Sequence, residues 1–211
     1  MAAEEKNYRH FFFQMLKQHN SENINHPADI SINEALSQAG RIIEDASQEQ
    51  HLSDIDCSKG CGYCCRLNIP TLPPEAWKIV SFIRNNFNID EFSYLIDKIH
   101  NNAFQIKYLD DDDRIACKIE CIFLNSEKSC SIYPVRPVLC RSVTSLDRED
   151  CKRALESVFT GEHHTILMNT FVKNLYNDLF IAITDFLESV GLSSKSEEIT
   201  QAVKNILENH E

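Results

Sequence analysis

The sequence predicts a mostly α-helical fold around an irregular, cysteine-rich centre. Apolar residues recur at helical spacing on both sides of this centre. The 211 residues contain no strand-like run of convincing length and no internal repeat. All nine cysteines lie between Cys57 and Cys151. We therefore expect three parts: an N-terminal helical segment (1–52), a cysteine-cluster core (53–160) and C-terminal helices (161–211) that pack on the core.

Helical spacing predicts two helices in the N-terminal segment. The first is marked by Tyr8, Phe11, Phe12, Met15 and Leu16. The second is marked by Ile32, Ala35, Leu36, Ala39, Ile42, Ile43 and Ala46. Ser31 and Glu34 have the spacing of a capping box, in which each side chain bonds the backbone N–H of the other residue. The second helix should therefore begin at Ser31.

Two further helices are expected between the cysteine segments. Pro73 and Pro74 suit the first turn of a helix that continues from Glu75 to about Asn86. Its apolar face consists of Trp77, Val80, Ile83 and Phe87. A helix from Asp90 to about Asn102 should bury Phe92, Leu95, Ile96 and Ile99. The acids Asp110 to Asp113 lack the alternating ligands and the glycine of a calcium loop, so they predict a solvated loop.

The C-terminal part predicts a long helix from Thr165 to Val190, which Gly191 ends. Its apolar face consists of Leu167, Phe171, Leu175, Leu179, Phe186, Leu187 and Val190. Ser194 and Glu197 form a second possible capping box before the last helix. That helix carries Ile199, Val203, Ile206 and Leu207. These apolar faces could cover the centre or form a homo-oligomer.

Composition excludes several classes of protein. The formal net charge of −11 argues against nucleic-acid binding, which needs Lys and Arg to replace phosphate counterions. No segment approaches the roughly eighteen apolar residues of a membrane helix. The acidic start, MAAEEKNYRH, does not resemble a secretory signal, so we expect a cytoplasmic protein without a membrane partner. An odd number of cysteines in a reducing compartment argues against a disulfide framework.

The first cysteine block, CSKGCGYCC, has the features of a metal-binding loop. Cys61 and Cys64 have the C-x2-C spacing that lets two sulfurs approach one metal, and Gly60 and Gly62 let the backbone bend. Adjacent side chains in extended backbone point in opposite directions. Cys64 and Cys65 therefore suit two different positions, such as a first site and a second site, a bridging position or the core.

The second block lies further along the chain, at Cys117, Cys121, Cys130, Cys140 and Cys151. Thiolates are soft ligands suited to zinc, copper(I) and iron–sulfur clusters. Eight of them would suffice for two four-sulfur sites, or for one cluster with structural cysteines. An ordinary zinc ribbon needs a second C-x2-C knuckle, which is absent. The first block also fits the three-cysteine loop of radical-SAM enzymes, but neither alternating strands and helices nor a Gly-Gly pair accompanies it.

The two blocks together resemble the YkgJ-type CxxCxxCC cysteine-cluster family. The stretch CIFLNSEKSCSIYPVRPVLCR, from Cys121 to Arg141, is similar to the family's C-x-F-L and C-x-I-Y-x-x-R-P-x-x-C-R elements. CGYCC matches the end of its first block, with Cys57 as the opening cysteine. Three residues instead of two separate Cys57 from Cys61, with Gly60 as the inserted residue. Cys151 matches a trailing cysteine, whereas Cys117 has no counterpart.

The resemblance implies a zinc- or iron-chelating domain whose metal ligands would be Cys57, Cys61, Cys64, Cys65, Cys121, Cys130, Cys140 and Cys151. It implies metal binding but no particular reaction, and whether the chain is an enzyme stays open. A similar cluster in flagellin lysine methylase suggests an iron–sulfur enzyme or electron carrier as the alternative function. A thiol redox sensor is the third alternative.

Side chains near the cysteines have candidate supporting roles. Arg136 and Arg141 flank Cys140 and would offset thiolate charge, although Arg136 could instead pair with a surface acid. Tyr133 should pack rather than bond a sulfur. His163 and His164 could supply a nitrogen ligand, but the beginning of a solvated helix explains them better.

Overall fold

The computed structural model describes residues 7–21, 24–50, 55–160 and 164–209. It is mostly helical, as predicted. The expected boundaries between the three parts, at residues 52–53 and 160–161, fall at or beside stretches outside the described residues. The three-part division therefore stays a prediction. None of the helices in the described ranges combines the length and apolar character needed to cross a membrane.

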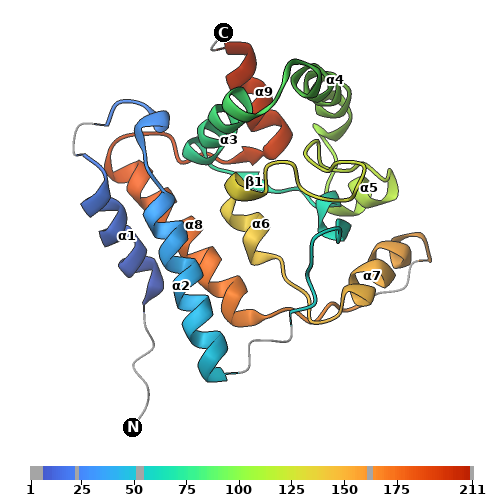
Figure 1. Cartoon of the computed structure of the whole chain (residues 1–211), viewed down its shortest axis with the longest axis horizontal. Coiled ribbons are helices and arrows are strands. Elements are labelled where there is room, and N and C mark those ends of the chain that lie inside the picture. The colour runs from blue at the N-terminus through green and yellow to red at the C-terminus, as the bar shows by residue number, and fades with distance from the viewer. Residues whose placement is uncertain (1–6, 22–23, 51–54, 161–163, 210–211) are drawn as a thin grey trace.

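One layer of the molecule consists of α1 (Tyr8–His19), α2 (Asn33–Gln50) and α8 (Thr170–Ser189). Figure 1 shows these helices running beside one another. Their apolar faces enclose one core, which includes Phe12, Leu16, Ala35, Ala39, Leu175, Leu179, Ile183, Phe186 and Leu187. The helical spacing in the sequence thus identified faces that pack within the chain.

A second core lies between α3 (Pro73–Asn86), α4 (Ile89–Ile106) and α9 (Ile199–Asn209). It includes Ile79, Val80, Ile83, Leu95, Ile99, Phe123, Ile132, Ile199 and Val203. The short strand β1 (Pro70–Thr71) pairs antiparallel with β2 (Glu197–Glu198), where α9 begins. This pairing brings the chain that follows the first cysteine block close to the C-terminal helix.

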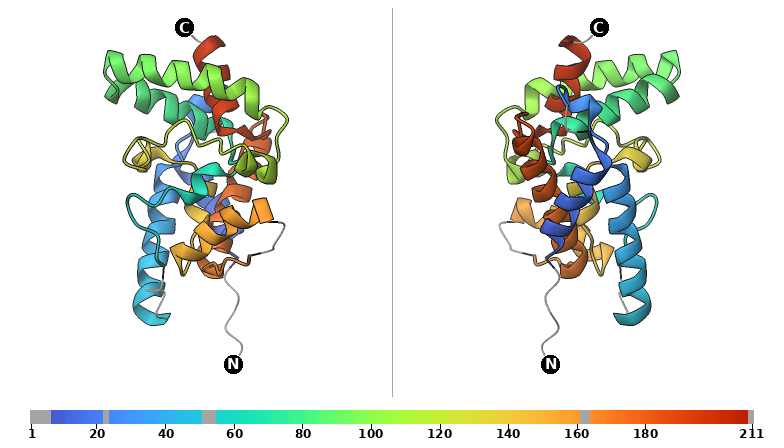
Figure 2. Two further views of the ribbon diagram at one scale, coloured as in Figure 1. Left: turned by 90° about the vertical axis from the view of Figure 1, so that its right-hand side faces the viewer. Right: turned by 90° about the vertical axis from the view of Figure 1, so that its left-hand side faces the viewer.

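Short elements fill the irregular centre. They are η3 (Tyr63–Arg66), α5 (Asp111–Ala116), η4 (Tyr133–Val135), α6 (Val138–Ser142) and α7 (Arg148–Thr160), while η1 (Pro27–Asp29) joins α1 to α2. Figure 2 shows α3 and α4 at one end of the molecule, α2 toward the other, and the irregular segments between them. Every cysteine belongs to this central part or to its helices.

Three predicted helix starts are wrong. The long helix begins at Thr170 rather than Thr165, because the Asn169 side chain accepts from Val172 N at 3.0 Å. Leu167 lies before the helix and is exposed. Neither predicted capping box forms: Ser31 N donates to Asn20 Oδ1 at 2.7 Å, and Ser194 Oγ donates to Glu188 Oε1 at 2.7 Å. In both predicted capping boxes, the serine group is hydrogen-bonded to a residue more distant in the sequence than the expected glutamate.

The loop predicted at Asp110 to Asp113 is also wrong. Asp110 accepts from Asp113 N at 2.8 Å and caps α5, whose first turn contains the other three acids. Acidic side chains near a helix N-terminus interact favourably with its dipole. Asp111 Oδ1 also accepts from Asn68 N at 2.6 Å, which ties α5 to the chain after the first cysteine block.

Candidate metal centre

The first cysteine block folds as a tight loop that ends in η3. Cys61 N donates to Ser58 O at 3.0 Å, and Cys65 N donates to Gly62 O at 3.1 Å. Gly60 has a φ of +90°, which side chains with a Cβ rarely adopt. A Cβ on Gly62 would lie 2.9 Å from Leu124 Cδ1. Gly60 is therefore needed for the turn, and Gly62 leaves room for the Leu124 side chain of the second block.

The loop is bonded directly to the second cysteine block. Cys121 N donates to Cys65 O at 2.7 Å. Leu124 and Cys130 form an antiparallel bridge, and Leu124 N donates to Cys121 O at 3.0 Å. Cys121 and Cys130 therefore stand on the two arms of one hairpin, beside the end of the first block.

Cys140 lies on α6, and a buried carboxylate holds the beginning of that helix. Glu75 Oε1 accepts from Val138 N at 2.6 Å, and its Oε2 accepts from Leu72 N at 2.8 Å. Burial raises the pKa of Glu75 to about 7, although both hydrogen bonds act to lower it. Sequence reasoning placed Glu75 only at a helix start, and the Pro-Pro-Glu pattern gave no signal for its second partner.

Cys57 and Cys151 meet at Ser145. Cys57 Sγ accepts from Ser145 N at 3.4 Å, and the Ser145 side chain is a hydrogen-bond partner of Cys151. The backbone is tied at the same point, because Asp56 N donates to Ser145 O at 2.9 Å. The start of the first block thus lies against the segment that leads into α7.

These contacts join segments that carry eight of the cysteines, and the family comparison covers the same stretch. Residues 56–157 match the CxxCxxCC family, which bears the description "Putative zinc- or iron-chelating domain". Neither the curated proteins nor the solved structures gave a significant match to the chain.

Within the CxxCxxCC domain the thiols act on one another electrostatically. Burial raises the pKa of Cys121 to about 12. Burial also raises the pKa of Cys140, and the nearby thiolates of Cys121, Cys64 and Cys130 raise it further. The pKa values of Cys57 and Cys151 are raised first by burial and then by Cys61 and Cys64. Such mutual effects require thiolates that lie near one another.

The pKa values of Cys64 and Cys65 are shifted in opposite directions although the two residues are adjacent. Their thiols are hydrogen-bonded to each other, which lowers the pKa of Cys64 to about 7 and raises that of Cys65. The Arg136 guanidinium also favours the Cys64 thiolate. The sequence prediction of opposite side-chain directions assumed extended backbone, whereas Cys64 and Cys65 lie in the helical turn η3 and their thiols contact each other.

Arg136 and Arg141 line the cysteine region of the CxxCxxCC domain. Arg136 stacks on Tyr133, with Cζ 4.4 Å from the ring centroid. Arg141 Nε and Nη2 donate to Arg136 O and Pro134 O, both at 3.2 Å. Arg136 Nε is buried and has no acceptor among the described residues. Soft sulfur donors beside a guanidinium that has one unsatisfied buried N–H fit an anionic metal–thiolate centre.

Cys117 and His164 take no part in the contacts described above. Cys117 is exposed at the end of α5. His164 Nε2 contacts Asp150 Oδ1 at 3.1 Å, and His163 is outside the described residues. Across the described part of the chain, no three or more His, Cys, Asp or Glu side chains form a ready-made metal site. Metal binding would therefore require the thiols to rotate toward a common point.

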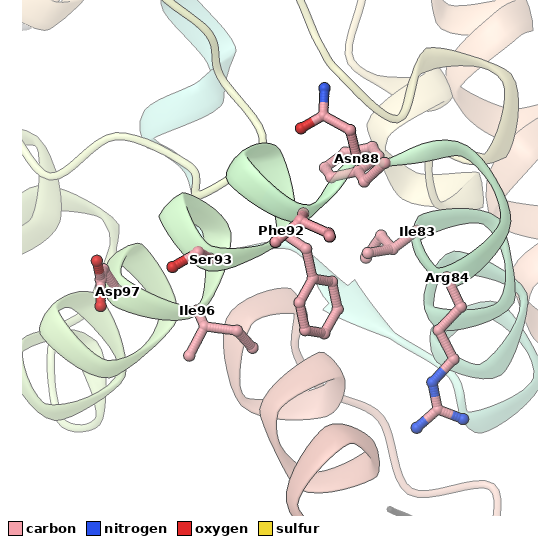
Figure 3. A pocket seen from close by; sticks show the side chains of 9 residues that line it. Ile83, Arg84, Asn88, Phe92, Ser93, Ile96 and Asp97 are labelled. Carbon is pink, nitrogen blue, oxygen red and sulfur yellow. The ribbon is translucent and has the colours of Figure 1, made fainter.

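A groove of about 500 Å³ lies elsewhere, and its lining residues come from α3, α4 and the turn between them. Figure 3 shows Ile83 and Phe92 near its middle, with Arg84 and Asp97 on opposite sides. These residues offer no soft donor. The cysteine region, rather than this groove, is the candidate metal centre.

Proposed function

We propose that this chain is a cytoplasmic metal-binding protein that chelates zinc or iron through cysteine thiolates from two segments. Cys57, Cys61, Cys64 and Cys65 are the ligands from the first segment. Cys121, Cys130, Cys140 and Cys151 are those from the second. The observation that carries the proposal is the 2.7 Å hydrogen bond from Cys121 N to Cys65 O, because it joins the two blocks at their cysteines.

Metal binding would require protons to leave these thiols. Thiolate is the ligand form, so metal binding competes with protonation and couples to folding. Arg136 favours the thiolate of Cys64, and Ser145 N–H donates to Cys57 Sγ. A bound zinc or iron centre would supply a cross-link between the two segments. The chain's own residues hold the thiols near one another and offset part of their negative charge.

Two alternatives use the same cysteines. An iron–sulfur cluster would favour an electron carrier or an enzyme, and it is distinguished from zinc by inorganic sulfide and visible absorption. A metal-free redox sensor would instead oxidise a pair such as Cys64 and Cys65, whose thiols are hydrogen-bonded. Clustered thiols in a reducing compartment would tend to capture metal, so we place the sensor last.

Serine substitutions test the ligand assignment. We expect Cys61→Ser and Cys140→Ser each to reduce bound metal and to lower the melting temperature, because each removes a ligand from a centre that cross-links the fold. Metal is measured per chain by elemental analysis, and unfolding by circular dichroism. Cys117→Ser is the matched control, since Cys117 is exposed at the end of α5 and has no counterpart in the family motif. Normal metal content in both ligand variants would contradict the assignment.

A further inference from the structure

We propose that the eight cysteines form two adjacent four-sulfur sites for soft divalent ions, and this proposal rests on the proposed function. The outer site consists of Cys57, Cys61, Cys64 and Cys151. The inner site consists of Cys65, Cys121, Cys130 and Cys140. The peptide bond between Cys64 and Cys65 joins the two sites, each of which has the tetrahedral ligand count of a closed zinc site.

The inner site is built on the hairpin and α6. Cys65 O accepts from Cys121 N at 2.7 Å, and Cys130 forms the bridge with Leu124 on the same hairpin. Cys121 and Cys130 also pack against the second hydrophobic core. Cys140 is positioned from the other side by α6, whose first N–H is fixed by Glu75. Three separate segments thus deliver the four sulfurs of the inner site.

The outer site is built around Ser145. This residue donates its backbone N–H to Cys57 Sγ at 3.4 Å and is bonded through its side chain to Cys151. Cys61 and Cys64 approach from the loop, with the C-x2-C spacing that places two sulfurs on one ion. Cys57 is exposed and Cys61, Cys64 and Cys151 are half-buried.

The mutual effects of the thiolates support the same division. The thiolates that act on Cys57 are those of Cys61, Cys64 and Cys151. Those that act on Cys140 are Cys121, Cys64 and Cys130. Cys64 therefore lies at the junction of the two groups. Its C-x2-C spacing assigns it to the outer site, and the adjacent Cys65 then completes the inner one.

The two sites differ in their access to solvent. The outer site includes the exposed Cys57, whereas Cys121 and Cys130 of the inner site are half-buried and pack against the second hydrophobic core. We expect the outer ion to exchange with a chelator faster than the inner one, because release of the inner ion requires the hairpin or α6 to open.

Cadmium-113 counts the sites directly, because Cd²⁺ is a soft ion that replaces zinc at thiolates. The full chain, reduced and titrated with ¹¹³Cd²⁺, should bind two ions and give two NMR resonances in the four-sulfur range. The double variant Cys57→Ser/Cys151→Ser should lose one resonance and keep the other, with its helical circular dichroism retained. Cys117→Ser should keep both.

Other outcomes would overturn the proposal in different ways. One ion per wild-type chain, or loss of both resonances in a folded double variant, would contradict two sites while leaving metal binding intact. A single four-iron cluster in the anaerobically purified chain would do the same. No cadmium binding by the folded wild-type chain would contradict the proposed function itself.

Discussion

At the scale of single residues, Glu75 combines burial with two backbone hydrogen bonds. Its carboxylate links Leu72, where α3 begins, to Val138, where α6 begins. Burial raises the pKa of Glu75 from its ordinary value of 4.5 to about 7. Between these two values the folded chain binds more protons at this carboxyl group than the unfolded chain does. The contribution of Glu75 to stability is therefore largest at low pH and falls as the pH rises toward 7.

Glu75→Gln should remove this pH dependence. The free energy of unfolding of the wild type, relative to the variant, should fall by up to about 3 kcal/mol between pH 4.5 and pH 7, since each pKa unit corresponds to about 1.4 kcal/mol. Urea unfolding of both proteins at several pH values measures this difference. A difference that stays constant over that range would contradict the account.

The second buried charge is Arg114, whose side chain is inaccessible to solvent. Its Nη1 donates to Glu198 Oε1 at 2.7 Å and to Asn68 Oδ1 at 2.9 Å. These bonds join α5, the chain after the first cysteine block and the beginning of α9. The arginine was not identified from the sequence, because its partners are distant along the chain.

Glu198→Ala should destabilise the fold by about 3–5 kcal/mol, because it leaves a buried guanidinium without its counter-charge. The exposed pair of Lys204 and Glu208, 2.8 Å apart on α9, provides the control. Removing Glu208 should cost less than about 1 kcal/mol. Chemical denaturation measures both effects, and equal losses in the two variants would contradict the role assigned to Arg114.

At the scale of elements, helical spacing located the helices better than it located their ends. Pro73-Pro74 correctly indicated the beginning of α3, and Gly191 follows the end of α8. The predicted capping boxes at Ser31 and Ser194 were wrong, because the Ser31 amide and the Ser194 hydroxyl donate hydrogen bonds to residues that precede the helix concerned. The short helices α5 and α6 were not predicted, since five or six residues carry few helical repeats. The helix α7, none of whose residues is buried, was not predicted either.

The loop of the first cysteine block depends on backbone conformation at Gly60. Gly60→Ala should cost about 1–2 kcal/mol, because its φ of +90° is unfavourable for a residue with a Cβ. Gly40→Ala is the matched control: Gly40 is helical and a Cβ there meets nothing within 4 Å, so this change should stabilise by about 0.5–1 kcal/mol. The melting temperature should fall in the Gly60 variant and rise in the Gly40 variant. A change in the same direction in both variants would contradict the loop geometry.

At the scale of the whole molecule, α8 and α9 pack into different cores. The helix α8 lies with α1 and α2, and α9 lies with α3 and α4. Between these two cores, Cys65 O accepts a hydrogen bond from Cys121 N of the hairpin. Cys57 Sγ accepts one from Ser145 N, in the segment before α7. A metal centre at this position would cross-link segments that otherwise meet through few backbone hydrogen bonds.

The candidate ligands were more predictable than the contacts that position them. Cysteine spacing and the family motif identified the candidate ligands, and the CxxCxxCC match covers all of them. Sequence reasoning could not identify Ser145 as the meeting point of Cys57 and Cys151, or Glu75 as the support of α6. Both depend on contacts between distant segments, for which a single sequence carries no local signal.

The measurement that tests metal binding most directly is the metal and acid-labile sulfide content of the chain purified without oxygen, together with its visible spectrum. We expect stoichiometric zinc or iron, with two ions per chain if both four-sulfur sites are filled. Iron with equimolar sulfide would identify a cluster and favour the electron-transfer or enzyme alternative. A folded, fully reduced chain that contains neither metal and takes up neither on addition would contradict the account.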